Sequence, residues 1–142
     1  MQQIDFHSHV PNRIVYACQV ARTVYRRGLR LAVWCSDERR LRQFNEMLWE
    51  RNPLEFIPHV DAQHPESAAT PIIFGSDLSQ LQADVLLLLD DYLPPEWEKA
   101  FVNFSRIIDV VSTNDEELKL SRQRYLAYKR AGVELKHYNR SN

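Results

Sequence analysis

The sequence predicts an α/β fold, in which a mainly parallel, twisted sheet carries helices on both faces in a Rossmann-like, three-layer arrangement. Segments with apolar residues at helical spacing alternate along the chain with short segments that are apolar at every second position or throughout. Residues 85–89 form an unbroken apolar run between acids, which is typical of a strand buried on both faces. Strands that alternate with helices pair in parallel through right-handed crossovers.

The first half of the chain predicts two strands and two helices. A short strand covers residues 4–7, and a helix over residues 12–28 ends at its final glycine. The inner face of this helix is formed by Ile14, Cys18, Ala21 and Tyr25. Residues 29–35 predict a buried strand, and residues 36–37 cap a second helix that ends before Pro53. The inner face of the second helix is formed by Leu41, Phe44 and Leu48.

Prolines interrupt the middle of the chain, after which the alternation of strands and helices resumes. We expect, in order, a short strand at 56–57, a loop at 59–70, and strands at 72–74 and 85–89, followed by a helix at 96–104 and a strand at 106–111. The last helix runs from Asn114, which has Glu117 three residues later as in a capping box, to Gly132. We find no internal repeat or linker, so we expect one domain over residues 1–142.

Composition and charge exclude several classes of protein. The 142 residues are 44% apolar, and their formal net charge of -1 argues against a generally basic nucleic-acid-binding protein. No apolar run approaches the roughly 20 residues that cross a bilayer, and the N-terminus lacks the apolar stretch of a signal peptide. Cys18 and Cys35 lie in apolar segments without CxxC spacing and are expected to be free thiols. We therefore expect a cytoplasmic protein with no membrane partner.

The C-terminal helix carries the polar residues that are best arranged for a partner. Lys119, Arg122, Tyr125 and Lys129 follow one another at spacings of three, three and four, which places three cations and a phenol ring on one face. Such a face suits an acidic, partly apolar ligand. A solvated helix, with Tyr125 and Tyr128 packed under long basic side chains, explains the same pattern.

A second candidate site lies at the end of the first strand, where His7 and His9 form an HxH motif. Alternate residues of a strand point the same way, as the paired imidazoles of some metal-dependent hydrolases do. Such sites need further histidines and acids on later strand ends. The histidines at 59 and 64 lie in the expected loop and His137 lies near the C-terminus, so surface histidines explain the pair more simply.

The chain lacks the motifs of nucleotide sites and of nucleophilic catalysis. The junction after the strand at 29–35 contains neither GxGxxG nor GxxxxGK[ST], and its acids would repel a phosphate. Ser76 and Ser105 have no GxSxG context. We therefore expect no cofactor.

A cluster of large apolar residues marks the end of the second helix and the segment after it. Trp49 falls one position beyond the inner-face residue Leu48, which places it at the edge of the buried stripe. With Phe56 it predicts either core packing or an exposed patch that anchors another protein.

Two stretches of the sequence together carry a resemblance to a known family. They are LAVWCSDERRLRQFNEMLWERNPLEFIPH and SRQRYLAYKRAG, and with them the chain resembles, over nearly its whole length, the chi subunit of the bacterial DNA polymerase III holoenzyme. This resemblance implies a non-catalytic accessory protein of the clamp loader in DNA replication. Chi subunits bridge the psi subunit and the C-terminal tail of the single-stranded DNA-binding protein, so DNA is reached only indirectly.

The resemblance also assigns residues to these partners. The tail is acidic and ends in an apolar residue with a free carboxylate, and Arg122, Tyr125 and Val111 match the positions that bind it. The chain has Leu118 and Leu126 where family members can carry lysines, and Lys119 and Lys129 are expected to supply the missing charge. The psi-binding surface corresponds to Trp49 and Phe56, and some family members share it with a repair helicase.

Overall fold

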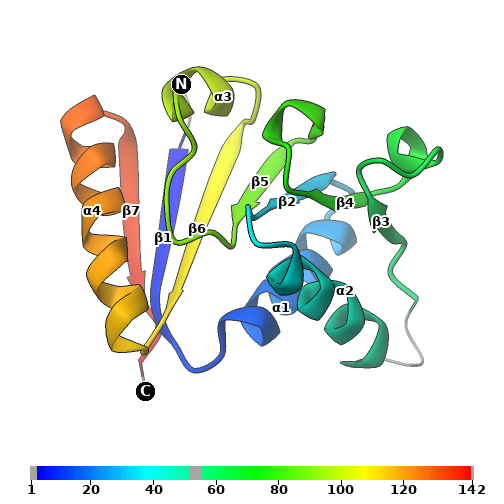
Figure 1. The fold of residues 1–142 in the computed structure, drawn as a ribbon, viewed down its shortest axis with the longest axis horizontal. Helices are drawn as coiled ribbons and strands as arrows, with labels where there is room; N and C mark the ends of the chain where they lie inside the picture. Colours follow the sequence, from blue (N-terminus) through cyan, green and yellow to red (C-terminus); the bar gives the residue numbers. More distant parts are fainter. Residues whose placement is uncertain (1–2, 52–55, 142) are drawn as a thin grey trace.

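The computed structural model describes residues 3–51 and 56–141 and places them in a single sheet flanked by helices (Figure 1). The strands are β1 (Gln3–Val10), β2 (Leu31–Trp34), β3 (His59–Asp61), β4 (Ile72–Gly75), β5 (Val85–Leu88), β6 (Arg106–Ser112) and β7 (Glu134–Asn139). The helices are α1 (Arg13–Arg26), α2 (Glu38–Arg51), α3 (Trp97–Phe101) and α4 (Asp115–Ala131), with short 3-10 turns at Ser67–Ala69 and Leu78–Gln80.

Every strand pair in the described part of the chain is parallel, in the order β3-β4-β2-β5-β6-β1-β7. The outermost strands are therefore β3 and β7, which lie at opposite edges of the sheet. Helices cross over between the strands, as a parallel sheet requires. The predicted α/β fold is confirmed.

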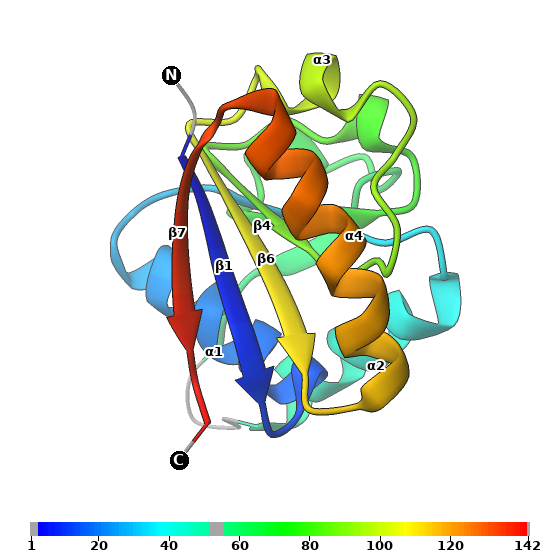
Figure 2. The same ribbon diagram turned by 90° about the vertical axis from the view of Figure 1, so that its left-hand side faces the viewer.

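Helices cover both faces of the sheet and form two cores. On one face, Ala17 and Cys18 of α1 and Phe44 of α2 pack against alternate strand residues such as Val33 and Val110. On the other face, α3 and α4 pack against the intervening residues, as Figure 2 shows for α4 beside β6, β1 and β7. Because strand side chains alternate between faces, the five inner strands contribute to both cores, whereas β3 and β7 contribute only to the core under α3 and α4.

Most elements lie where the sequence predicts them, with four corrections. The strand predicted at 56–57 is wrong, because the backbone that pairs with β4 is His59–Asp61. The expected loop at 59–70 accordingly contains β3 and a 3-10 turn. The helix predicted at 96–104 is shorter, since Glu96 has a left-handed φ of 55° and helix α3 begins after it.

The fourth correction is β7, which the sequence analysis missed. Its residues are mostly polar and exposed, with Leu135 and Tyr138 partly buried, so its period-2 pattern is weak. Helix α2 ends at Arg51, and the proline predicted to stop it, Pro53, lies outside the described residues. Among the helices described here, none has the length and apolarity needed to cross a membrane.

Candidate peptide-binding site

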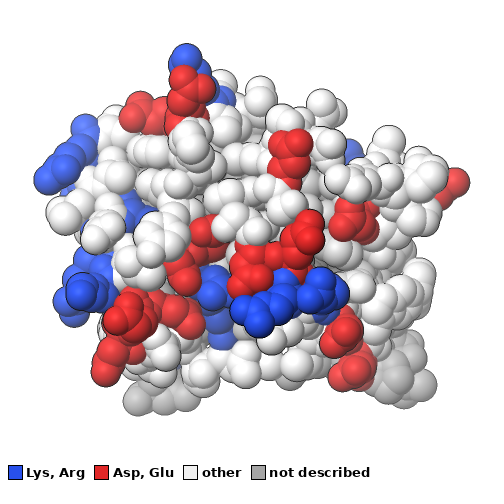
Figure 3. Space-filling view, in the orientation of Figure 1, with Lys and Arg blue, Asp and Glu red and all other residues white. Residues whose placement is uncertain are grey.

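Helix α4 forms for reasons that are local to its sequence. The side chain of Asn114 accepts a hydrogen bond from the backbone N–H of Glu117 at 3.1 Å, and Gly132 ends the helix with a left-handed φ of 72°. Three acids occupy the first turn and two cations the last, each favoured by the helix dipole. Figure 3 shows this separation, with acidic atoms where α4 begins and basic atoms along the rest of it.

A buried polar cluster fixes α4 on the sheet. The Asp109 carboxylate of β6 accepts hydrogen bonds from Arg124 Nε and Nη2 at 2.9 and 3.0 Å and from the Tyr128 hydroxyl at 2.6 Å. Burial acts to lower the pKa of Arg124, but the charge of Asp109 outweighs it and raises that pKa above its ordinary value. Burial and the same carboxylate raise the pKa of Tyr128. The helix is therefore held in one rotation about its axis, which determines the face it presents to solvent.

The exposed side of α4 forms a hollow of about 510 Å³ with the ends of β1 and β7. Its lining is largely apolar and aromatic, with one permanent cation, and comprises Phe6, Ser8, His9, Leu118, Ser121, Arg122, Tyr125, Leu126 and His137. The Tyr125 ring lies edge-on to the ring of Phe6 with centroids 5.3 Å apart, and this contact holds Tyr125 against the sheet. Lys129 Nζ lies 5.7 Å from the centroid of the same Tyr125 ring.

The structure brings some of the predicted residues together and separates others. Arg122 and Tyr125 line the hollow, with Lys129 beside them. Lys119 is exposed on α4 but does not line the hollow. Val111 is fully buried in the core beneath α4 and does not line the hollow.

Five residues of the lining, among them Ser121 of α4, were not singled out as part of this site by sequence reasoning. Phe6, Ser8 and His9 come from β1 and His137 from β7, and only the sheet places them beside α4. The buried Ser8 hydroxyl lies 2.7 Å from His137 Nε2 and 2.9 Å from His9 Nδ1. The HxH motif in the sequence includes His9, but it suggested a metal site and not a peptide-binding site.

His7 and His9 do not point toward one site. The pairing of β1 with β6 shifts register between His7 and Val10, and His9 has a left-handed φ of 59°. His7 consequently contacts Tyr16 on the α1 side, whereas His9 lines the hollow on the α4 side. Within residues 3–51 and 56–141, no group of three or more His, Cys, Asp or Glu side chains could hold a metal ion. This geometry removes the basis of the HxH metal-site alternative.

The crevice where doubly wound sheets hold nucleotides is occupied here by ion pairs. Asp91, just after β5, lies 2.7 Å from Arg13 and 3.3 Å from Arg40, and Arg124 donates to its backbone carbonyl at 2.6 Å. Burial acts to raise the pKa of Asp91, but the two arginines outweigh it and hold that pKa below its usual value. These side chains take the space that a phosphate would need.

The aromatic patch at the end of α2 is exposed. Trp49 is 50% and Phe56 64% accessible to solvent, and their ring centroids lie 5.2 Å apart. Trp49 also packs on His59 of β3, with centroids 4.6 Å apart. Both rings are therefore exposed and not part of the core, and their role as an anchor for another protein stays a prediction. The patch lies at the β3 edge of the sheet, opposite the β7 edge that carries the hollow (Figure 1).

Comparison with solved structures supports the fold alone. The C-terminal part of the Fun30 ATPase domain superposes with a TM-score of 0.55 at 12% identity, covering 78% of this chain and 44% of that one.

Comparison with protein families is more specific. The family profile described as "DNA polymerase III chi subunit, HolC" matches residues 1–136. The chain is 32% identical to the DNA polymerase III subunit chi of Haemophilus influenzae over 111 residues, 77% of this chain and 74% of the relative. It is 29% identical to the Escherichia coli subunit over 120 residues, 83% and 79% of the two chains, and 28% identical to the Pseudomonas aeruginosa subunit over 141 residues, 95% and 94%. The chain belongs to the DNA polymerase III chi subunit family, with an accessory role in DNA replication.

Proposed function

We propose that this chi-family chain is a cytoplasmic, non-catalytic adaptor of the clamp loader that bridges the psi subunit and the acidic C-terminal tail of the single-stranded DNA-binding protein. The observation that carries the proposal is the hollow on α4, which combines Arg122 with an apolar and aromatic lining. A tail that ends in an apolar residue needs both features, because one binds its carboxylate and the other its side chain.

The chemistry of the hollow fits a chain terminus. A guanidinium can donate two parallel hydrogen bonds to a carboxylate, and Arg122 is exposed on α4 where a terminus can reach it. Phe6, Tyr125 and Leu126 present apolar surface for the last side chain of the tail. The ammonium of Lys129 beside Tyr125 would attract the acids that precede it.

The second surface supports the bridging role. Trp49 and Phe56 form an exposed aromatic pair, the kind of side chain that anchors stable protein interfaces. We assign this patch to the psi subunit. A repair helicase that shares the surface would bind the same patch. The assignment needs no movement of α4, because the patch and the hollow lie at opposite edges of the sheet.

Tail binding of this kind is expected to be weak and salt-sensitive, since it depends on exposed charges. The single-stranded DNA-binding protein compensates for this weak affinity if it presents several tails at once, because each further contact then forms within the same complex.

Calorimetric titration tests the proposal. The protein is titrated with an acidic peptide ending in phenylalanine, with the same peptide amidated at its C-terminus, and with a peptide lacking the phenylalanine. We expect binding only to the first. Arg122→Ala should weaken it by about 1.5–3 kcal/mol, the range for a hydrogen bond to a charged group.

The exposed Arg39, on α2, supplies the matched control, since Arg39→Ala removes one surface cation away from the hollow. Equal binding of all three peptides, or an equal loss in both arginine variants, would show that the hollow does not recognise a chain terminus.

A further inference from the structure

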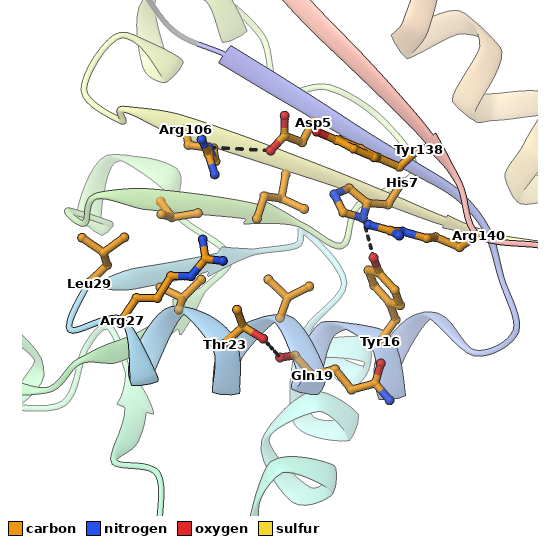
Figure 4. A pocket seen from close by; sticks show the side chains of 14 residues that line it. Asp5, His7, Tyr16, Gln19, Thr23, Arg27, Leu29, Arg106, Tyr138 and Arg140 are labelled. Atoms are coloured by element: carbon orange, nitrogen blue, oxygen red, sulfur yellow. Dashed lines mark hydrogen bonds and ion pairs between the residues drawn. The ribbon is translucent and has the colours of Figure 1, made fainter.

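A second hollow, of about 440 Å³, lies on the other face of the same strands and has no part in the proposed adaptor function (Figure 4). It opens between α1 and the strands β6, β1 and β7. On this face β7 presents Glu134, Lys136 and Tyr138, which pair in register with Gln3, Asp5 and His7. Polar residues on the outer strand indicate that solvent, and not a helix, covers this part of the sheet.

Three arginines from different elements line this hollow against one acid. They are Arg27 after α1, Arg106 at the start of β6 and Arg140 after β7, and the acid is Asp5. Asp5 is already engaged, because Arg106 lies 3.6 Å from its carboxylate and Gln3 donates to it at 2.6 Å. The charged lining therefore has a net charge of +2, although the whole chain is slightly acidic.

The remaining two arginines have no acidic partner in the described part of the chain. Among residues 3–51 and 56–141, neither Arg27 nor Arg140 forms an ion pair, and Arg140 instead lies over the Tyr138 ring, 5.2 Å from its centroid. The neighbouring His7 does not add to this charge at neutral pH, since burial and Arg140 lower its pKa to about 4. Two unpaired guanidinium groups at one hollow favour an anionic ligand.

The spacing of the two arginines favours a polymer over a small anion. Figure 4 shows Arg27 beside Leu29 at one end of the hollow and Arg140 beside His7 at the other. Figure 4 shows Arg106 at the same end of the hollow as Arg27, so the strand register gives the separation of the two ends. Arg106 pairs with Gln3, whereas Arg140 follows Asn139, which pairs with Ser8. Five residues of strand separate these levels, or about 17 Å at 3.3 Å per residue. A single phosphate or carboxylate cannot span that distance.

The surface between the arginines is apolar and aromatic. Val20, Val24 and Ile108 form its floor, and the rings of Tyr16, His7 and Tyr138 lie along one side. A groove that combines backbone-binding cations with apolar and aromatic surface for bases is typical of proteins that bind single-stranded nucleic acid.

We propose that this hollow binds a short segment of single-stranded DNA, with phosphates two or more nucleotides apart on Arg27 and Arg140 and bases over the apolar floor. The low net positive charge makes the contact weak by itself. It becomes effective when the adaptor is already held close to DNA, because tethering raises the local concentration of the strand. The composition argument against a generally basic DNA-binding surface still holds, since the charge here is confined to one hollow.

Fluorescence anisotropy with a labelled oligothymidylate of about ten nucleotides, within the usual range of single-strand site sizes, tests this inference. We expect saturable binding at low salt that weakens as salt rises. The double variant Arg27→Gln/Arg140→Gln should weaken binding at least about tenfold and reduce the salt slope by about 1.4, since each single-strand phosphate contact contributes about 0.7.

Three controls separate this site from the others. Arg39→Gln removes an exposed cation elsewhere and should leave oligonucleotide binding unchanged. Arg122→Ala should reduce binding of the acidic peptide only. The double variant should still bind the acidic peptide, so loss of peptide binding and loss of oligonucleotide binding can be distinguished. Circular dichroism and thermal unfolding confirm that each variant is folded.

Three results would overturn the inference. The first is the absence of binding at low salt, and the second is binding by the double variant as tight as that of the unmodified protein. The third is displacement of the oligonucleotide from the hollow by an acidic peptide at matched charge concentration, which would mean that the hollow binds an acidic protein segment.

Discussion

At the scale of single residues, two leucines that replace the lysines expected from the resemblance shape the hollow on α4. Leu126 is 51% exposed and lines the hollow, and Leu118 lines it beside Arg122. Both leucines add apolar surface without charge. The site should therefore depend more on the terminal apolar residue of the tail, and less on its acids, than a site with lysines there.

Leu126→Lys tests this balance. The new ammonium should strengthen binding of the acidic peptide by about 0.5 kcal/mol at low salt, the typical size of an exposed charge pair, and the gain should vanish at high salt. Titration calorimetry at two salt concentrations measures it. Gln123→Lys adds the same charge to an exposed position of α4 outside the hollow, and an equal gain there would mean that general attraction is responsible.

His7 predicts a pH dependence of stability. Burial lowers its pKa in the folded protein to about 4, below the ordinary value of 6.5. Between these values the unfolded chain binds more protons, so the contribution of neutral His7 is complete above pH 6.5 and is lost as the pH falls toward 4.

The expected loss over this interval is about 2 kcal/mol, because one pKa unit corresponds to about 1.4 kcal/mol and solvent screens part of the shift. Urea unfolding at several pH values should show a flatter profile for His7→Gln than for the unmodified protein. Parallel profiles for the two proteins would contradict the assignment.

At the scale of elements, both local sequence signals and tertiary contacts determine where α4 forms and how it packs. Its sequence supplies a cap, a terminating glycine and charges that suit the helix dipole, and its tertiary setting supplies the buried contacts of Arg124 and Tyr128 with Asp109. Because Arg122 and Tyr125 lie in the same helix, the hollow is positioned by the packing of the whole element and not by a loop.

Asn114→Ala should destabilise the protein by about 1 kcal/mol, since the N–H of Glu117 loses its side-chain acceptor. Denaturant unfolding provides the measurement. Asn114→Asp retains an acceptor and adds a favourable charge at the helix start, so it should be at least as stable as the unmodified protein. If both variants unfolded alike, the cap would not contribute.

At the scale of the whole molecule, the two proposed protein surfaces lie at opposite edges of a seven-stranded sheet. Six inter-strand spacings separate β3 from β7, or roughly 29 Å at 4.8 Å each. The proposed bridging role needs two separate surfaces, and the two edges of the sheet supply them.

This separation predicts that each surface can be disabled alone. Trp49→Ala combined with Phe56→Ala should remove association with a psi subunit in size-exclusion chromatography while leaving peptide binding unchanged. Arg122→Ala should have the converse effect. Both side chains of the aromatic pair are at least half exposed, so the double variant should remain folded. Loss of both activities in either variant would contradict the two-surface arrangement.

Local signals in the sequence determined the α/β fold, the caps of α4 and the exposure of Arg122, because helical spacing, caps and apolar runs act through neighbouring residues. Only the tertiary structure decided which strands lie side by side. It added β7, whose weak pattern depends on pairing with β1, and so brought His137 beside Tyr125. It also placed His7 and His9 on opposite faces of the sheet, through a register shift that their spacing in the sequence does not predict. Finally, it placed Arg27 and Arg140 at one hollow, although 113 positions separate them in the chain. These outcomes depend on contacts between distant segments, which no local pattern specifies.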